Sequence, residues 1–388
     1  MIYASPQLGE PELRVIDELD EMRSELRHNV RDRRRWLGSL RRLTFARNVQ
    51  GSNSIEGYDA SLDDVLAAID DEETLEAGEE TRLALRGYRD ALTYVMQIAR
   101  DADPPPIDES LLKSLQFMMI RHDLSKNPGQ WRPGAIWVER EDDHELVYEA
   151  PDRELVPELV RELVASLNQS SDPADHAVIR AAMAHLNLVM IHPYSDGNGR
   201  MARCLQTLVL ARERIVAPEF SSIEEYLGRN TTAYYDVLAT VGQGAWSPGN
   251  DALPWVRFCL TAHHRQAQTL LRRVEETEQL WAALEDLVRE RGVPSRSIGP
   301  LADAARGLRL GNATYRRLVA QSEGEDIAEL TATRDLKRLV DADLLAALGE
   351  RRGRTYTPSK DLRMLWARIR ANRPKRSDED PFVDVQEL

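Results

Sequence analysis

The 388-residue chain has only two cysteines, Cys204 and Cys259, and both fall in apolar stretches with helical spacing. A disulfide framework is therefore not expected, and a reducing compartment is indicated. The first residues lack a basic segment followed by an apolar run. No apolar stretch reaches the roughly 20 residues that a membrane-spanning helix needs. We therefore expect a cytoplasmic protein with no membrane partner.

The composition is that of a globular protein. Hydrophobic residues make up 42% of the chain and charged residues 30%, which argues against disorder, and the length suits two or three domains. The net charge is −14, yet residues 331–376 hold 13 Lys and Arg against five Asp and Glu, a local net charge of +8. This asymmetry argues against an overall nucleic-acid-binding surface and leaves one basic module near the C-terminus.

Apolar residues recur at helical spacing along most of the chain. Helices are predicted within residues 11–56 and over residues 79–100, 108–122, 152–168, 175–190, 230–238 and 255–290. In the last of these, a heptad-like seam consists of Leu270, Val274, Thr277, Trp281, Leu284 and Val288. We expect one long helix there that joins two domains, and a dimer contact along it is a further interpretation.

One short segment concentrates the candidate chemistry. Residues 192–200 read His-Pro-Tyr-Ser-Asp-Gly-Asn-Gly-Arg, and Arg203 follows. Apolar periodicity over residues 201–211 predicts a helix, so the two glycines lie in the turn that begins it. Unpaired backbone N–H groups and the helix dipole favour an anion at such a turn. Arg200 and Arg203 share one face of this helix and can therefore bind the same phosphate.

The other residues of this segment suit phosphoryl-type chemistry. Asp196 offers a hard oxygen ligand for Mg²⁺, which proteins bind through one or two carboxylates together with substrate phosphates. His192 can accept a proton from an attacking hydroxyl near neutral pH. Gly197 and Gly199 allow the backbone to approach a phosphate closely. A glycine-rich turn before a core helix, with a histidine that only packs, is the alternative interpretation.

The segment closely resembles the signature of the Fic family, His-x-Phe-x-(Asp/Glu)-Gly-Asn-Gly-Arg-x-x-Arg. Tyr194 is the one departure, at a position where phenylalanine is usual, and we expect it to keep a buried anchoring role. Fic proteins typically transfer AMP from ATP to a Ser, Thr or Tyr hydroxyl of a target protein and release pyrophosphate. Gly199 separates this chain from a kinase-like branch of the family that carries lysine there.

The resemblance implies a role for each motif residue. His192 would be the general base and Asp196 the Mg²⁺ ligand, residues 197–199 would form the anion hole, and the two arginines would hold the β- and γ-phosphates. The nucleotide-binding residues would be Asp196, Gly197, Asn198, Gly199, Arg200, Arg203, Tyr234 and Tyr235. Of the two tyrosines, one would help to enclose the base, while core packing is the alternative for at least one of them.

A second match lies far upstream, where residues 52–57 read Ser-Asn-Ser-Ile-Glu-Gly. They fit the family's inhibitory pattern, (Ser/Thr)-x-x-x-Glu-(Gly/Asn). Ser52 and Glu56 share a face if the segment is helical, and Gly57 suits a helix stop. The resemblance implies that Glu56 pairs with Arg203, which would keep the γ-phosphate from binding and misalign the α-phosphate. A solvated helix end is the alternative.

Between these motifs, Gly129-Gln-Trp-Arg132 precedes residues 136–148, whose apolar ends and charged middle are typical of a β-hairpin with a tip near Asp142 and Asp143. It resembles the family's flap, which presents a strand edge to the target segment. The closing Tyr148-Glu-Ala-Pro151 matches the family's usual ending only in part. A structural hairpin that covers the core is the alternative.

Beyond Pro294 the sequence predicts a different module, in which residues 330–345 have the pattern of a recognition helix. Its inward positions would be Leu336, Leu339, Val340 and Leu344. Its outward positions would be Arg334, Lys337 and Arg338. Residues 350–358 resemble the basic wing of a winged helix. DNA binding, protein interaction and packing are the three interpretations, and residues 377–388 are expected to form an acidic tail.

We therefore predict an all-α protein, a Fic-type helical core with a small β-hairpin flap and a C-terminal winged-helix-like domain. The predicted segments are an N-terminal helical region with the inhibitory helix (1–105), the Fic core (106–265), a connecting helix (266–292), the winged-helix-like domain (293–362) and a helix end with the tail (363–388).

The predicted function is that of an auto-inhibited protein adenylyltransferase that uses ATP and Mg²⁺. An unidentified protein, or the chain itself, would be the target, and DNA and a second copy of the chain are further candidate partners. Two alternatives stay open. One is a hydrolase that uses Glu56 to remove AMP from a modified protein, and the other is a DNA-binding regulator whose Fic core senses a nucleotide.

Overall fold

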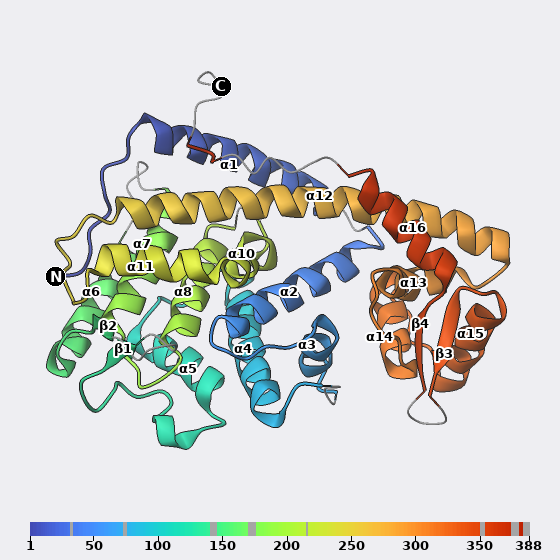
Figure 1. Ribbon diagram of the computed structural model, residues 1–388, viewed down its shortest axis with the longest axis horizontal. Coiled ribbons are helices and arrows are strands. Elements are labelled where there is room, and N and C mark those ends of the chain that lie inside the picture. The colour runs from blue at the N-terminus through green and yellow to red at the C-terminus, as the bar shows by residue number, and fades with distance from the viewer. Residues whose placement is uncertain are drawn as a thin grey trace. The chain divides into compact units, whose positions relative to one another are not determined.

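The computed structural model describes the chain except for residues 32–33, 73–75, 140–145, 170–175, 215, 350–353, 374–379 and 383–388. Figure 1 shows the order of the elements along the described part. Two compact units are each assembled from separate stretches of chain. The first comprises the described residues of Met1–Ser24, Ala46–Ala267 and Glu379–Leu388. The second comprises those of Glu25–Phe45 and Gln268–Asp378.

Three helices contribute residues to both units: α1 (Glu10–Asn29), α2 (Leu37–Ser54) and α12 (Leu253–Arg291). The helices of the first unit are α3 (Leu62–Ile69), α4 (Glu79–Ile98), α5 (Glu109–Ile120), α6 (Val156–Asn168), α7 (Ala177–Ile191), α8 (Asn198–Arg212), α9 (Pro218–Ser221), α10 (Glu224–Arg229) and α11 (Thr231–Gly242). Those of the second unit are α13 (Ile298–Ala305), α14 (Asn312–Glu323), α15 (Glu329–Asp341) and α16 (Lys360–Ala371).

Helices α7 and α8 form the centre of the first unit. They pack against each other, and almost every side chain of both helices is buried. Helices that are buried on all sides belong to a core rather than to a surface. Trp255 of α12 packs on this pair and donates from its indole Nε1 to the carbonyl oxygen of Ala182 over 2.7 Å. The loop between α7 and α8, residues 192–197, is therefore held at both ends by the core.

A short hairpin lies beside this loop. Strand β1 (Trp137–Glu139) pairs antiparallel with β2 (Leu146–Glu149), with Val138 opposite Tyr148. The predicted tip at residues 142–143 lies outside the described residues. Tyr148 is buried, and its hydroxyl donates to the carbonyl oxygen of Met190 over 2.9 Å. This bond fastens the hairpin to the C-terminal end of α7.

The predicted all-α fold is confirmed. Within the described residues, strands form only two antiparallel pairs, β1–β2 and β3 (Leu345–Leu348) with β4 (Thr355–Pro358). The predicted long helix is present as α12, and all six seam residues are buried within this single chain. The seam is therefore used for packing inside the chain. No helix in the described ranges combines the length and the apolar character needed to cross a membrane.

The predicted recognition helix ends earlier than expected. Helix α15 stops at Asp341, because Asp343 adopts a left-handed conformation with φ +56° and turns the chain toward β3. Leu344 is therefore buried outside the helix, and its N–H donates back to the carbonyl oxygen of Leu339 over 2.9 Å. Val340, predicted to face inward, is only half-buried.

The basic positions of α15 lie on its outer face. Arg334, Lys337 and Arg338 are exposed, and Lys337 pairs with Asp341 over 3.1 Å. The hairpin β3–β4 follows directly, but the basic turn at residues 350–353 lies outside the described residues. The winged-helix assignment and DNA binding through this module stay predictions.

Candidate functional site

The motif loop is bounded by two left-handed residues. Helix α7 ends at Ile191 because His192 adopts φ +51° and ψ +57°. Gly197 ends the loop with φ +79°, and a Cβ there would lie 2.9 Å from Cδ1 of Ile120, so both conformation and space require glycine. Helix α8 then begins at Asn198. The loop and the first turns of α8 thus present the whole motif on one continuous stretch of backbone.

Asn198 holds this loop closed with its side chain. Its Oδ1 accepts from the backbone N–H of Tyr194, and its Nδ2 donates to the carbonyl oxygen of the same residue, both over 2.9 Å. Asn198 is buried, so both bonds are shielded from water. What Asn198 can offer an anion is therefore its backbone N–H and not its side chain.

Tyr194 is fully buried, as the resemblance implied. Its ring centre lies 5.2 Å from that of Trp131. The hydroxyl has no hydrogen-bond partner among the described residues, and burial raises its pKa. A phenylalanine would fill the same place without an unpaired hydroxyl, which accounts for the usual residue at this position.

His192 is half-buried where α7 ends. Its Nδ1 lies 3.1 Å from the carbonyl oxygen of Val189, which places the proton on Nδ1 and leaves Nε2 as the basic nitrogen. Burial lowers the pKa of His192, against smaller raising effects of the Val189 bond and the charge of Glu56. The imidazole therefore stays neutral, and can accept a proton, at a lower pH than an ordinary histidine.

Arg200 is a buried cation with free donors. It is 1% exposed, and neither Nε nor Nη1 has a hydrogen-bond partner among the described residues. Its Nη2 lies 3.5 Å from Oδ1 of Asp196. No side chain caps the N-terminus of α8, because Gly197 occupies the capping position. A buried guanidinium beside uncapped helix N–H groups is a strong anion-binding arrangement.

Asp196 is the candidate metal ligand. Its Oδ1 accepts from the N–H of Gly197 over 2.5 Å, whereas Oδ2 has no partner among the described residues. The described residues contain no group of three or more His, Cys, Asp or Glu side chains that could hold a metal ion. One carboxylate, a third exposed, fits a Mg²⁺ ion that is held jointly by substrate phosphates, but not one held by the protein alone.

The inhibitory segment and the second arginine meet as the resemblance implied. Arg203 is 1% exposed, and its Nη2 donates to Oε1 of Glu56 over 2.6 Å. Its Nε donates to Oγ of Ser52 over 2.8 Å, and its Nη2 also donates to the carbonyl oxygen of Ser52 over 2.9 Å. Only Nη1 has no partner among the described residues.

Ser52 lies in helix α2, but the helix ends before Glu56. Glu56 lies in the turn just after the helix. Helix α2 ends at Ser54, and Gly57 adopts φ +80°. The N–H of Gly57 donates to the carbonyl oxygen of Ser54 over 3.1 Å, and that of Tyr58 donates to Asn53 over 3.0 Å. This pair of bonds is the Schellman motif, which requires a left-handed residue at the position of Gly57. The motif turns Glu56 toward Arg203.

The Glu56 carboxylate covers the N-terminal turn of α8. A Cβ on Gly199 would collide with its Oε1, so a side chain at position 199 is incompatible with this arrangement. Burial raises the pKa of Glu56, but the charges of Arg203 and Arg200 outweigh it and hold the pKa below its usual value. An ionised carboxylate of the chain itself therefore lies at the N-terminal turn of α8.

The two candidate base-binding tyrosines have different surroundings. Tyr234 is 1% exposed, and its hydroxyl lies 3.0 Å from Nε2 of His185, whose pKa burial lowers to about 3. Tyr235 is 47% exposed, and its hydroxyl donates to the carbonyl oxygen of Ile55 over 3.1 Å. Tyr234 is thus a core residue, and Tyr235 is the one of the two that a ligand can reach.

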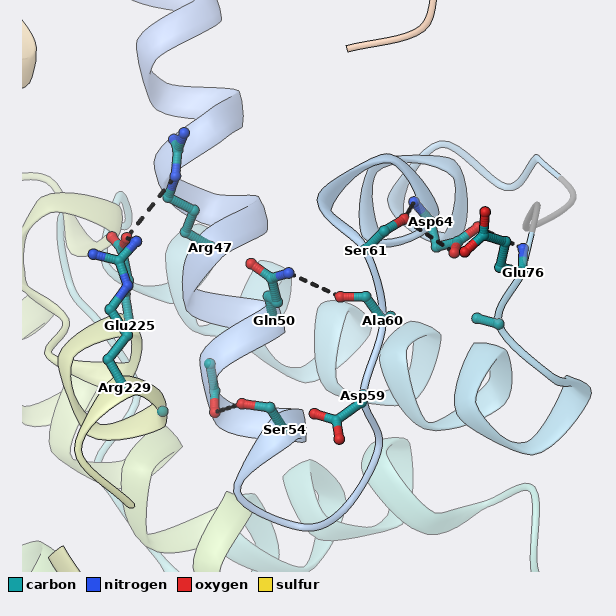
Figure 2. Close-up of a pocket in the computed structure, with 13 residues that line it drawn as sticks. Arg47, Gln50, Ser54, Asp59, Ala60, Ser61, Asp64, Glu76, Glu225 and Arg229 are labelled. Atoms are coloured by element: carbon teal, nitrogen blue, oxygen red, sulfur yellow. Dashed lines mark hydrogen bonds and ion pairs between the residues drawn. The ribbon is translucent and has the colours of Figure 1, made fainter. Parts of the chain in front are cut away.

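A cavity of about 500 Å³ lies along another face of α2, away from Ser52 and Glu56. Figure 2 shows Arg47 and Gln50 of α2 on its walls, with Glu225 and Arg229 of α10 on one side and Asp59 of the following loop below. Ser52 and Glu56 are not among its lining residues. The last turns of α2 therefore separate this cavity from Arg203.

At the side of this cavity, α2 and α10 touch through their backbones. A Cβ on Gly228 would lie 2.6 Å from Cα of Gly51 and 2.7 Å from its carbonyl oxygen. A Cβ on Gly51 would in turn collide with the backbone of Glu224. The nearest atoms in this contact belong to the backbone, which cannot move aside as a side chain would, so two glycines set how closely the end of α2 approaches α10.

Sequence reasoning did not identify Tyr58 or Glu224. The Arg200 guanidinium lies over the Tyr58 ring, 5.2 Å from its centre, and the signal was an aromatic residue directly after the inhibitory pattern. Burial raises the pKa of Glu224 to about 7, and its Oε1 accepts from the hydroxyl of Tyr88 over 2.8 Å. Glu224 lies beside Glu225 in the first turn of a short helix, and no sequence pattern distinguishes it.

Comparison with known proteins assigns the region that contains the motif to a protein family. A family model described as Fic/DOC family matches residues 106–210. The chain therefore carries a Fic domain, built around helices α5 to α8.

"Protein adenylyltransferase fic-1" of Caenorhabditis elegans is 26% identical over 259 residues, which cover 66% of this chain and 45% of that protein. "Protein adenylyltransferase Fic" of Nematostella vectensis is 25% identical over 284 residues, covering 69% and 58%. The chain thus spans about half the length of these curated relatives.

Solved structures share the fold. A Fic family protein from Desulfovibrio desulfuricans G20 superposes with a TM-score of 0.57 at 20% identity, covering 92% of this chain and 98% of that chain. Residues 134–508 of Fic-1 from C. elegans superpose with a TM-score of 0.55 at 20% identity, covering 68% and 73%. At these identities the likeness concerns the fold alone, and it confirms the predicted Fic-type helical core.

Replacing Tyr194 with phenylalanine removes a buried hydroxyl that has no partner. We expect the free energy of unfolding to rise by about 1 kcal/mol, at the lower end of the cost of an unpaired buried polar group. Tyr148→Phe is the matched control, because its hydroxyl bonds to Met190, and it should lose about the same amount. Urea denaturation measures both variants, and destabilisation by Tyr194→Phe would contradict the unpaired state.

His192 should titrate below the usual histidine pKa of about 6.5, because burial disfavours its charged form. Since the negative charge of Glu56 raises this pKa, Glu56→Gln should lower the midpoint further. An NMR titration of the imidazole Hε1, assigned with His192→Asn, measures both midpoints. A midpoint at or above about 6.5 in the unliganded protein would show that burial does not govern this group.

Proposed function

We propose that this chain is a protein adenylyltransferase, which transfers AMP from ATP to a Ser, Thr or Tyr hydroxyl of a target protein, and that Glu56 inhibits it. One observation carries the proposal. Two arginines that are each 1% exposed converge on the uncapped N-terminus of α8, one turn from the His192 loop, and the chain's own carboxylate covers that point. The names of the curated relatives support the same reaction class.

The triphosphate would lie along the first turn of α8. The backbone N–H groups of residues 198–200 and the free donors of Arg200 would bind its oxygens. Asp196 would hold Mg²⁺ together with the phosphates, through the oxygen that no described residue contacts. When bound, this ion would offset the negative charge that develops on the leaving phosphates.

His192 would supply the base. Its Nε2 would accept the proton of the target hydroxyl while the hydroxyl oxygen forms a bond to the α-phosphorus. The bond between the α-phosphorus and the oxygen that bridges to the β-phosphate breaks, and pyrophosphate leaves with its charge held by Arg200 and Arg203. Such transfers depend mainly on positioning and on electrostatic stabilisation of the leaving group.

A target segment would pair with the outer edge of β1. The far side of β2 is covered, since the N–H of Glu149 donates to Gly244 over 2.9 Å and its carbonyl oxygen accepts from Trp246 over 3.1 Å. In the described part of the chain nothing pairs with the other edge of β1, and Trp137 on this strand is 53% exposed. Strand addition binds through main-chain groups and therefore selects little for sequence.

Inhibition would come from competition for Arg203. Its Nε and Nη2 already bind Ser52 and Glu56, so a γ-phosphate would have to displace the carboxylate from the guanidinium. Two anions cannot share this position, because their repulsion in a buried site is strong. An intramolecular carboxylate also has a high effective concentration. The resting chain would therefore bind ATP without aligning its α-phosphorus.

Glu56→Gly should raise AMP transfer above that of the unchanged chain, because it frees Arg203 for the γ-phosphate. Glu56→Gln keeps the side-chain volume without the charge and should give a smaller gain. Labelling of the chain and of a cell lysate with α-³²P-ATP measures all variants, and mass spectrometry identifies the modified residue.

Two controls decide how this result is interpreted. Arg203→Ala in the Glu56→Gly background should abolish the gain, because the productive complex needs the same arginine. His192→Ala in that background should lower transfer by about 10²–10⁴-fold, the usual contribution of a general base, and leave ATP binding intact. If Glu56→Gly labels no better and instead loses the removal of AMP from a modified target, Glu56 acts in hydrolysis and the proposed direction is wrong.

Gly228→Ala should also activate the enzyme, through the backbone contact with Gly51. The added Cβ forces the end of α2 away from α10, which weakens the bond between Glu56 and Arg203. We expect transfer to rise, though less than in Glu56→Gly, with a loss of about 1–3 kcal/mol of stability from overpacking. Gly249→Ala is the matched control, since its Cβ would meet nothing within 4 Å. A folded Gly228→Ala variant with unchanged labelling would show that this contact does not control inhibition.

A further inference from the structure

Arg132 binds the backbone directly behind the candidate base. Its Nε donates to the carbonyl oxygen of His192 over 3.0 Å, and its own N–H donates to that of Pro193 over 2.9 Å. Both carbonyl groups lie just beyond the end of α7, where the helix can no longer pair them. A positive charge at the C-terminal end of a helix is also favourable. Arg132 thus stabilises the loop at the residue whose imidazole would act as base.

The same side chain binds both ends of the β1–β2 hairpin. Its Nη1 donates to the carbonyl oxygen of Gly134 over 2.6 Å, just before β1, and its Nη2 donates to that of Pro151, just after β2. Arg132 is only 4% exposed, so these bonds are shielded from water. One guanidinium therefore joins three pieces of backbone: the His192 loop and the two ends of the hairpin.

We propose that Arg132 is a positioning residue, which sets the distance between Nε2 of His192 and the strand edge where the target hydroxyl would be presented. This inference rests on the proposed function. It differs from a role in nucleotide binding, because none of the Arg132 donors reaches the N-terminus of α8 or the side chains of Asp196, Arg200 or Arg203. Loss of Arg132 should therefore affect the transfer step and not the affinity for ATP.

An arginine is needed for geometric reasons. The guanidinium is planar and presents its donors in a rigid fork, so that Nε, Nη1 and Nη2 can bind three carbonyl oxygens in different directions. A lysine keeps the charge but has a single nitrogen on a flexible stem. Lysine would satisfy one of these carbonyl groups and leave the others unpaired, so it should not restore the function.

The test compares Arg132→Lys and Arg132→Met in the Glu56→Gly background. We expect kcat for transfer to fall by about 10²-fold in both, since small misplacements of reacting groups cost this much, while KM and calorimetric affinity for ATP·Mg²⁺ stay unchanged. Arg153→Met is the matched control. Among the described residues, the polar partners of Arg153 are the carbonyl oxygen of Pro133 and the exposed Glu154 at the same end of the hairpin, and its loss should change neither parameter.

A second measurement does not depend on activity. In Arg132→Met, amide hydrogen exchange should increase together at residues 134–138, 146–151 and 192–194, and in Arg153→Met it should not. The inference is overturned if the lysine variant transfers AMP like its parent, if ATP affinity falls in step with kcat, or if only one of these segments loosens. If the Glu56→Gly parent itself transfers no AMP, the proposed function fails, and the exchange pattern alone still decides whether Arg132 couples loop and hairpin.

Discussion

The guanidinium of Arg203 is buried in the middle of a helical unit, and the rest of the site follows from the anionic partner that it has there. Removing the charge from water is costly, and an opposite charge with good hydrogen-bond geometry offsets that cost. In this chain the partner is Glu56, assisted by the hydroxyl and carbonyl groups of Ser52. In the proposed function a nucleotide phosphate is the other anion for the same donors, so one cation would serve two mutually exclusive states.

The position of Glu56 depends on backbone geometry more than on its own side chain. The left-handed turn at Gly57 directs it, and the glycine contact sets how closely the end of α2 approaches α10. The dipole of α8 adds a favourable field for a carboxylate at that point. The arginine and the helix terminus therefore both stabilise the carboxylate, and these are the two features that the proposed function assigns to phosphate binding.

What could be predicted from sequence depended on whether the signal was local. The motif from His192 to Arg203 is continuous, so its helix, its turn and its clustered charges followed from spacing alone. The contact between Glu56 and Arg203 spans 147 positions and was predicted only from a family pattern. Tyr234 and Tyr235 are adjacent and chemically identical, so only the packing of α11 shows which one is buried. No sequence pattern predicts the close approach of Gly228 to Gly51, because these two residues are far apart along the chain.

Side-chain roles were harder to predict than element types. The amide of Asn198 fits an anion hole by motif, yet its bonds go to Tyr194. The four backbone bonds of Arg132 depend on three loops whose approach no periodicity encodes. The early end of α15 depends on a left-handed aspartate, which propensity does not require. In each case the missing information was tertiary.

Helices α1, α2 and α12 each contribute residues to both compact units. The second unit therefore does not consist only of residues that follow the Fic domain, because it also includes residues 25–45. A chain ending near residue 267 would leave residues 25–45 without the segments that Ser39 and Arg42 bind through Asp303.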